Sequence, residues 1–233
     1  MAKDIPDFLI PIDEGNLNPQ IKVLFDAMKE LKHSPHKITD VKSINNRIIE
    51  RNYVCSIIYQ LGKLSNSRYF PFSDSILIGG DMNKYIEANK TAIRVTGENL
   101  EFSFNGDRFE VIPDLIIHGS HNRDSIHGNE QFVAVEVKST DYLGIVAFEK
   151  DFFKLNAYLT CLNYQHAIYV IVNSDKETIN IRIKQYVDNN FFVISERLGD
   201  LYFFIQDSIY AEPIAYRIDD AKYEEERKKV ETK

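Results

Sequence analysis

Apolar residues recur at the three-to-four-residue spacing of an amphipathic helix in several segments of the chain. This spacing predicts helices over residues 19–32, over a longer segment from 40 or 43 to 63, and over 147–162. A shorter helix is predicted over 81–89. The segment 177–190 fits two patterns, because its isoleucines alternate as in a strand while its apolar residues also recur as in a helix.

Other segments alternate apolar and polar residues, or are continuously apolar, as strands are. A short strand is predicted at 75–78, and an Asn105-Gly106 pair joins the alternating runs 100–104 and 107–111. An Asn-Gly pair favours a two-residue hairpin, because both turn positions need a positive φ. The remaining predicted strands cover residues 132–138, 167–172 and 201–205.

The strand after the hairpin is expected to continue through Pro113 to Asp114, and the polar loop 118–130 joins it to the strand at 132–138. Pro113 has no backbone donor, so it indicates a sheet edge or a bulge. The order helix, three-strand meander, helix and strand predicts an α/β fold, a mixed β-sheet flanked by helices with an N-terminal helical extension.

Length and composition agree with one globular α/β unit. A chain of 233 residues with 44% apolar side chains can bury a sizeable core. Residues 1–42 are predicted to form a loose lead-in and a helix, and residues 43–215 the α/β domain. Residues 216–233 are predicted to be a charged tail, either a frayed helix or disordered.

Two of the predicted strands carry ionisable residues among apolar ones. Asp114 lies between Val-Ile-Pro and Leu-Ile-Ile, and Glu136 and Lys138 alternate with valines. An ionised group in such a run needs a cation, a partner or a water-filled cleft to compensate it. Residues i and i+2 of a strand share a face, so Glu136 and Lys138 are expected to point the same way.

Charge distribution bears on possible partners. The net charge is −7, which gives no overall attraction for nucleic acid. Residues 21–68 nevertheless hold nine Lys and Arg against four Asp and Glu, a surface that can either meet nucleic acid or merely solvate helices. Cys55 and Cys161 are expected to be buried reduced thiols, and the alternative is a disulfide between them. With no apolar run long enough to span a membrane, a cytoplasmic protein is predicted.

The chain contains Pro113-Asp114, then twenty-one residues, then Glu136-Val137-Lys138. This pattern resembles the signature of the PD-(D/E)XK nuclease superfamily, the restriction-endonuclease-like proteins. The resemblance covers residues 43–173 and includes the order of elements. It implies that Asp114, Glu136 and the Val137 backbone carbonyl bind a metal, with Glu50 as a further ligand. Lys138 would position or activate the attacking water.

The resemblance implies a Mg²⁺-dependent nuclease that hydrolyses DNA phosphodiester bonds, a restriction-type or genome-defence endonuclease, with Mn²⁺ able to substitute. Lys154 and Tyr158 would face the substrate phosphate. A homodimer is expected, because cutting both strands needs two sites. The alternative function is a catalytically inactive, nuclease-like module for nucleic-acid binding or assembly.

Each candidate residue also has a structural interpretation. Glu136 and Lys138 can form a simple salt bridge on an exposed strand, and Glu50 can pair with Arg47 or Arg51. Lys154 and Tyr158 can solvate a helix surface. Three histidines lie in the polar loop, and their spacing suggests zinc, but without cysteines they are better explained as polar-loop residues; they are His118, His121 and His127.

Overall fold

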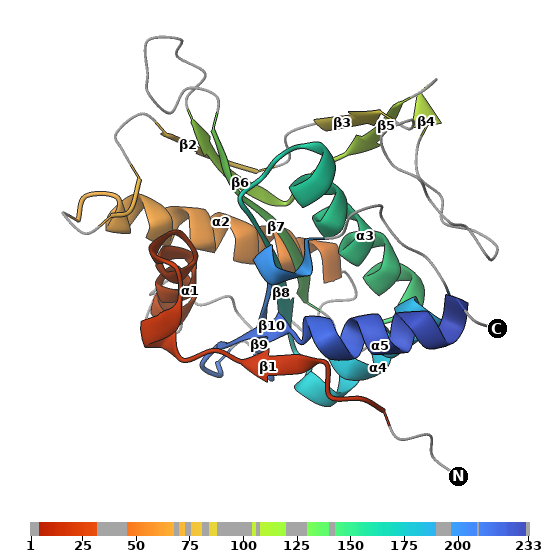
Figure 1. Ribbon diagram of the computed structural model, residues 1–233. Coiled ribbons are helices and arrows are strands. Elements are labelled where there is room, and N and C mark those ends of the chain that lie inside the picture. The colour runs from red at the N-terminus through yellow and green to blue at the C-terminus, as the bar shows by residue number, and fades with distance from the viewer. Residues whose placement is uncertain are drawn as a thin grey trace.

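The structure is a computed structural model of the 233-residue chain. It describes residues 5–31, 46–67, 70–72, 76–80, 84–87, 104–105, 108–119, 130–139, 143–189, 197–208 and 210–231. Within this part, the chain forms a seven-stranded mixed sheet, a separate three-stranded sheet and five α-helices, which confirms the α/β class (Figure 1).

The large sheet has the strand order β1-β10-β9-β8-β7-β6-β2. Strands β7, β8 and β9 are parallel, and the other neighbours are antiparallel. The strands are β1 (Leu9–Pro11), β2 (Ile76–Gly79), β6 (Leu115–Gly119), β7 (Gln131–Ser139), β8 (His166–Val172), β9 (Leu201–Gln206) and β10 (Ile214–Ile218).

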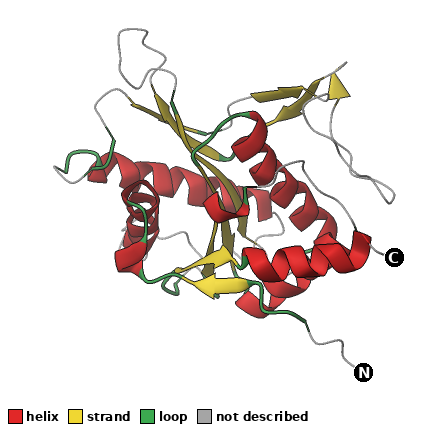
Figure 2. Ribbon diagram, viewed as in Figure 1, coloured by secondary structure: helices red, strands yellow, loops and turns green. Residues whose placement is uncertain are grey.

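Helices cover both faces of this sheet (Figure 2). Helices α1 (Pro19–Leu31) and α2 (Asn46–Leu64) share a core with Val133, Val135 and Val137 of β7. The opposite face packs against α3 (Ile145–Cys161), α4 (Lys176–Asp188) and α5 (Asp220–Glu231). The alternation of side chains along β7 therefore separates two cores.

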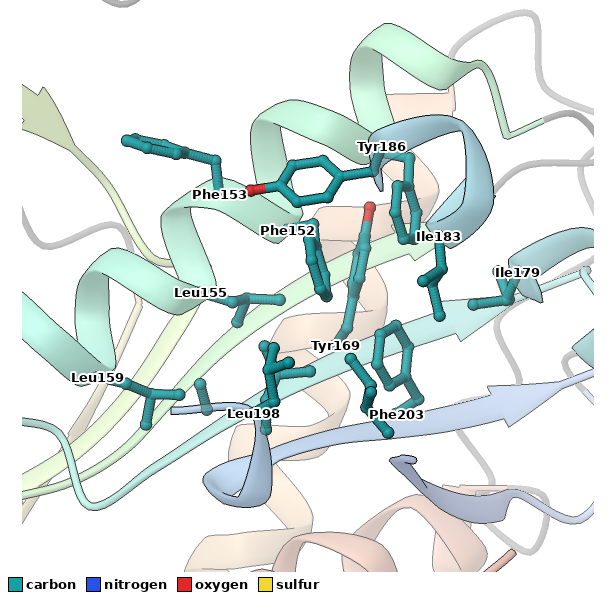
Figure 3. Packing of buried hydrophobic residues seen from close by; sticks show 14 of the residues in the cluster. Phe152, Phe153, Leu155, Leu159, Tyr169, Ile179, Ile183, Tyr186, Leu198 and Phe203 are labelled. Carbon is teal, nitrogen blue, oxygen red and sulfur yellow. The ribbon is translucent and has the colours of Figure 1, made fainter. Parts of the chain in front are cut away.

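The core under α3 and α4 is rich in aromatic residues, as Figure 3 shows. Phe152 of α3 meets Tyr186 of α4 edge to face, with ring centroids 4.6 Å apart. The ring centroids of Tyr169 in β8 and Phe203 in β9 are 6.0 Å apart. These side chains are fully buried, so they anchor α3 against the sheet.

The helix predictions are confirmed at 19–32 and 147–162, and for the part of 40–63 that is described. The ambiguous segment 177–190 is the helix α4, which Asp175 caps by accepting from the Thr178 N–H at 2.7 Å. The predicted charged tail contains α5, whose Tyr223 is buried in the core. The predicted loose lead-in contains β1, which pairs with β10.

The predicted helix at 81–89 is wrong. Residues Lys84–Glu87 form strand β3, which pairs with β5 (Arg108–Val111), and β4 (Phe104–Asn105) completes the small sheet beside α3. The predicted hairpin exists, but Asn105 pairs with Arg108 and so belongs to the strand. Neighbouring strand partners here override the weak helical period.

The predicted meander also needs correction. The chain does not run as one strand from the hairpin to Asp114, because β5 ends at Val111 in the small sheet and β6 starts at Leu115 in the large one. Pro113 lies at this break, where its missing N–H interrupts no ladder. The antiparallel meander of the large sheet is β2, β6 and β7, with the small sheet inserted between its first two strands.

Candidate active site

Asp114 and Glu136 lie side by side at the junction of β6 and β7. Leu115 pairs with Val135 in the antiparallel register, and the Asp114 N–H donates to the Val135 carbonyl at 3.0 Å. One more step of this register sets Asp114 opposite Glu136. The Val137 N–H in turn donates to Asp114 Oδ2 at 2.7 Å, which fixes the carboxylate against β7.

Gly80 makes room for this arrangement at the end of β2. A Cβ at this position would lie 2.8 Å from the Asp114 carbonyl oxygen, closer than real Cβ atoms approach. Any other residue would push the Asp114 backbone away, so the site depends on a glycine here.

Glu136 points from β7 towards α3, where two donors hold its carboxylate. The Tyr158 hydroxyl donates to Oε1 at 2.6 Å, and the Lys154 ammonium contacts Oε2 at 2.5 Å. The exposed fraction of Glu136 is 2%, and Tyr158 is fully buried. The interpretation of Lys154 and Tyr158 as surface-solvating residues is therefore wrong, because both belong to the site.

Lys138 follows Glu136 on the same strand face, as predicted, but the two do not form the simple salt bridge considered above. The Lys138 ammonium lies 3.2 Å from Asp151 Oδ2 on α3 and 3.8 Å from Glu50 Oε2 on α2. Its side chain is 25% exposed, which makes it the most accessible cation of the site.

Glu50 reaches the site from the other helix layer. Its Oε1 accepts a hydrogen bond from the Ser139 N–H at 3.2 Å, at the carboxyl end of β7. Its ion pair is with Lys138, whereas the side chain of Arg47 lies outside the described part. Glu50 thus joins the site, and the buried Val54 and Ile57 show that the stripe of α2 in line with Glu50 faces the core.

Asp151 is the residue that the sequence did not identify. It is buried on α3, where Oδ1 lies 3.2 Å from the Lys154 ammonium and Oδ2 accepts from the Tyr169 hydroxyl at 3.2 Å. The available signal was its i+3 spacing to Lys154 and its place on the polar face of α3. The sequence alone does not reveal that β7 and β8 cover that face.

The charged groups form one alternating chain, which we call the ion-pair chain. Its members run in the order Glu50, Lys138, Asp151, Lys154 and Glu136. Each ammonium lies between two carboxylates. Such an arrangement compensates buried charges that would be costly alone.

Burial nevertheless shapes the protonation of these groups. It raises the pKa of Glu136 to about 8, although Lys154 opposes the shift. It also raises the pKa of Asp114 and of Glu50. Burial alone would lower the pKa of Lys154, but the Glu136 and Asp151 carboxylates raise that pKa overall, so the ammonium keeps its proton.

For Asp151, burial acts upward, but Lys154 and Lys138 lower the pKa overall. For Lys138, burial acts downward, but Asp151 and Glu50 raise the pKa overall. The centre of the ion-pair chain therefore stays ionised, and Glu136 at its end is the carboxyl group that most readily takes up a proton.

The donor chemistry of the site fits a hard divalent cation, and protein donors already contact each of its carboxylates. The site has four carboxylates and two ammonium groups, which leaves an excess of two negative charges when all are ionised. The carboxylates are those of Glu50, Asp114, Glu136 and Asp151, and the ammonium groups are those of Lys138 and Lys154. Carboxylate oxygens are the ligands Mg²⁺ prefers. In the described part of the chain, no three His, Cys, Asp or Glu residues are grouped tightly enough to hold an ion.

The histidine cluster is only partly described. His118 lies in β6 and is buried, so it is not a loop residue, while His121 and His127 fall outside the described ranges. The two cysteines are free thiols as predicted, but neither is buried, because Cys55 is exposed and Cys161 is only partly buried. None of the described helices has the length and apolarity needed to span a bilayer.

Comparison with known proteins gives no further identification. The chain matches no protein-family model, no curated protein and no solved structure.

Proposed function

We propose that this protein is a Mg²⁺-dependent nuclease that hydrolyses DNA phosphodiester bonds, of the restriction-type or genome-defence kind, with a restriction-endonuclease-like core. The convergence of Glu50, Asp114, Glu136 and Lys138 supports this proposal most strongly, because these residues come from three separate segments. The order α2, the β2–β6–β7 meander, α3 and β8 agrees with the resemblance noted in the sequence.

Asp114, Glu136, the Val137 carbonyl and Glu50 would hold the metal ion. A bound Mg²⁺ would lower the pKa of a coordinated water and stabilise charge on the phosphate and the leaving oxygen. The raised pKa values of Asp114, Glu136 and Glu50 reflect burial without enough positive charge, which is the condition that a divalent cation relieves.

The remaining residues have roles that follow from their contacts. Lys138 is partly exposed and carries the ammonium that can orient an attacking water and offset charge in the transition state. Tyr158 and Lys154 hold Glu136 in place, and Lys154 compensates its charge while no other cation is near. Contact of Lys154 with a substrate phosphate would require it to leave Glu136.

One observation favours a second candidate, an inactive nuclease-like module for nucleic-acid binding or assembly. Both oxygens of Glu136 already have protein donors, so the carboxylate is satisfied without a metal. In that case, the ion-pair chain is a structural network, and DNA would bind without being cut.

Cleavage of DNA distinguishes the two candidates. Supercoiled plasmid, linear duplex DNA and RNA are incubated with the wild-type protein and either Mg²⁺, Mn²⁺ or a chelator. We expect metal-dependent cutting of DNA, its loss in Asp114→Ala, and a much lower but measurable rate in Lys138→Ala. Asp26→Ala is the matched control, because Asp26 also pairs with a lysine, at 2.7 Å, but on the exposed face of α1.

Two outcomes contradict the proposed function. Equal cleavage by the wild-type protein and Asp114→Ala would show a contaminating nuclease or another site. Tight DNA binding without cleavage in any metal would support the inactive module. Cleavage of RNA alone would keep the site and change the substrate, and gel filtration of the active protein would test the expected homodimer.

A further inference from the structure

Asp151 has an environment that none of the proposed catalytic roles requires. Its side chain is 5% exposed, yet it carries a charge that contacts two ammonium groups and a tyrosine hydroxyl. Burial of a carboxylate at such a position needs a compensating gain, because apolar side chains of similar size would stabilise the fold as well or better. The gain has to be sought in what Asp151 does to its partners.

The fold places Asp151 between the two lysines. Phe148 and Phe152 of α3 pack into the aromatic core and fix the rotation of the helix, which turns Asp151 and Lys154 towards β7. Tyr169, which stands beside Glu136 in the parallel register of β7 and β8, donates to the same Asp151 oxygen that faces Lys138. Asp151 is therefore held from two directions.

Lys138 forms ion pairs with two carboxylates, and the two distances differ. Asp151 on α3 lies 3.2 Å from the ammonium, and Glu50 on α2 lies 3.8 Å away on the other helix layer. A flexible lysine whose side chain is partly exposed would otherwise shift towards Glu50 or into solvent. The shorter contact with the better-held carboxylate sets where the ammonium stands.

We propose that Asp151 is the positioning residue of the site: it holds the Lys138 ammonium beside the Asp114–Glu136 pair while it also pairs with Lys154. This inference rests on the proposed nuclease function. Asp151 acts through Lys138 rather than on the substrate, so its loss should leave substrate binding largely intact and slow the chemical step.

Steady-state kinetics of Asp151→Asn and Asp151→Glu test this role. We expect Asp151→Asn to lower kcat about 10- to 100-fold, as loss of a supporting partner commonly does, with KM changed less than about twofold. In a Lys138→Ala background, Asp151→Asn should lower kcat by no more than about twofold, because the residue it positions is gone. Asp151→Glu should restore part of the rate, and Asp26→Asn should match the wild-type protein.

A second measurement needs neither metal nor substrate. Trace acetylation of the metal-free protein, mapped by mass spectrometry, reports how freely each lysine reacts. The acetylation of Lys138 should rise severalfold in Asp151→Asn, whereas that of Lys22 should stay constant. If Asp151→Asn does not fold, Asp151→Glu can replace it in this measurement, because the longer side chain should also alter the reactivity of Lys138.

The outcomes separate this inference from the proposed function. If Asp114→Ala abolishes cleavage while Asp151→Asn cleaves at the wild-type rate, the positioning role is wrong and the nuclease stands. An equal loss of kcat in the wild-type and Lys138→Ala backgrounds would also overturn it. If the wild-type protein cuts nothing, the nuclease proposal fails, and unchanged Lys138 acetylation would remove the positioning role as well.

Discussion

Helix α3 divides two buried regions of opposite chemistry. On one side, Phe148, Phe152 and Leu155 enter the aromatic core with α4 and β9 (Figure 3). On the other side, Asp151 and Lys154 enter the ion-pair chain. Asp151 and Lys154 are largely buried, as the aromatic side chains are, so the difference lies in what burial does to each kind of side chain.

Burial of the aromatic side chains stabilises the fold directly, because each removes a large apolar surface from water. Burial of the ion-pair chain costs free energy, and this cost is offset only when every charged partner is in place. Tyr169 connects the two regions, since its ring lies in the aromatic core and its hydroxyl donates to Asp151. The comparison teaches that burial by itself stabilises one side of α3, whereas the buried charges on the other side depend on their partners.

The largest expected effect comes from the aromatic side. Phe152→Ala should lower the free energy of unfolding by about 3–5 kcal/mol, because it leaves a cavity among fully buried rings. Urea unfolding followed by circular dichroism measures this loss. A change below about 1 kcal/mol would mean that the core under α3 is loosely packed.

Removal of one cation from the ion-pair chain should come next. Lys154→Met leaves Glu136 and Asp151 with less positive charge, and it should lower the free energy of unfolding by about 3 kcal/mol at neutral pH. The matched surface variant is Lys22→Met, which breaks the pair with Asp26 and should change stability by less than about 0.5 kcal/mol. Equal effects of the two variants would contradict the burial of the chain.

The pH dependence of stability isolates the contribution of Glu136. Its pKa rises on folding from 4.5 to about 8, so the folded state binds more protons than the unfolded state between these values. Stability attributable to Glu136 is therefore lost as pH rises through that window, and the penalty is complete above it.

Glu136→Gln removes this dependence. Relative to the wild-type protein, the variant should gain about 3 kcal/mol of stability between pH 5 and pH 8, because each unit of the pKa shift corresponds to about 1.4 kcal/mol. Chemical unfolding at several pH values measures the difference, with Glu14→Gln, which breaks an exposed pair with Lys29, as the control. Parallel pH profiles of wild-type and Glu136→Gln proteins would show that Glu136 does not titrate abnormally.

The smallest effect is expected at the connection between the two regions. Tyr169→Phe keeps the ring in the aromatic core and removes only the hydroxyl bonded to Asp151, so it should lower stability by about 1 kcal/mol. Tyr210→Phe, at an exposed position, should leave the unfolding midpoint unchanged. A Tyr169→Phe variant as stable as the wild-type protein would separate the aromatic core from the ion-pair chain.

The sequence predicts the parts of this molecule that depend on local period. The apolar stripes of α1 and α3 and the continuous apolar run of β8 identify these elements, because burial of one face imposes the spacing. The meeting of Asp114, Glu136 and Lys138 is also predictable. It needs only the i, i+2 geometry of one strand and an adjacent strand.

Other features depend on partners that the local sequence does not contain. Strand β1 has three residues, too few for any period, and it exists because β10 offers an edge. Strand β3 forms because β5 supplies its hydrogen bonds. Asp151 resembles an ordinary polar residue of a helix face until β7 and β8 are packed against it.

The most direct test of the account is the effect of Mg²⁺ and Mn²⁺ on thermal unfolding, because it requires no knowledge of the substrate. A cation that binds only the folded site raises its stability with concentration. We predict that Mn²⁺ raises the Tm of the wild-type protein and leaves that of Asp114→Asn almost unchanged, with Asp26→Asn behaving as wild type. An equal rise in all three proteins, or no rise in the wild-type protein, would contradict a metal centre at Asp114 and Glu136.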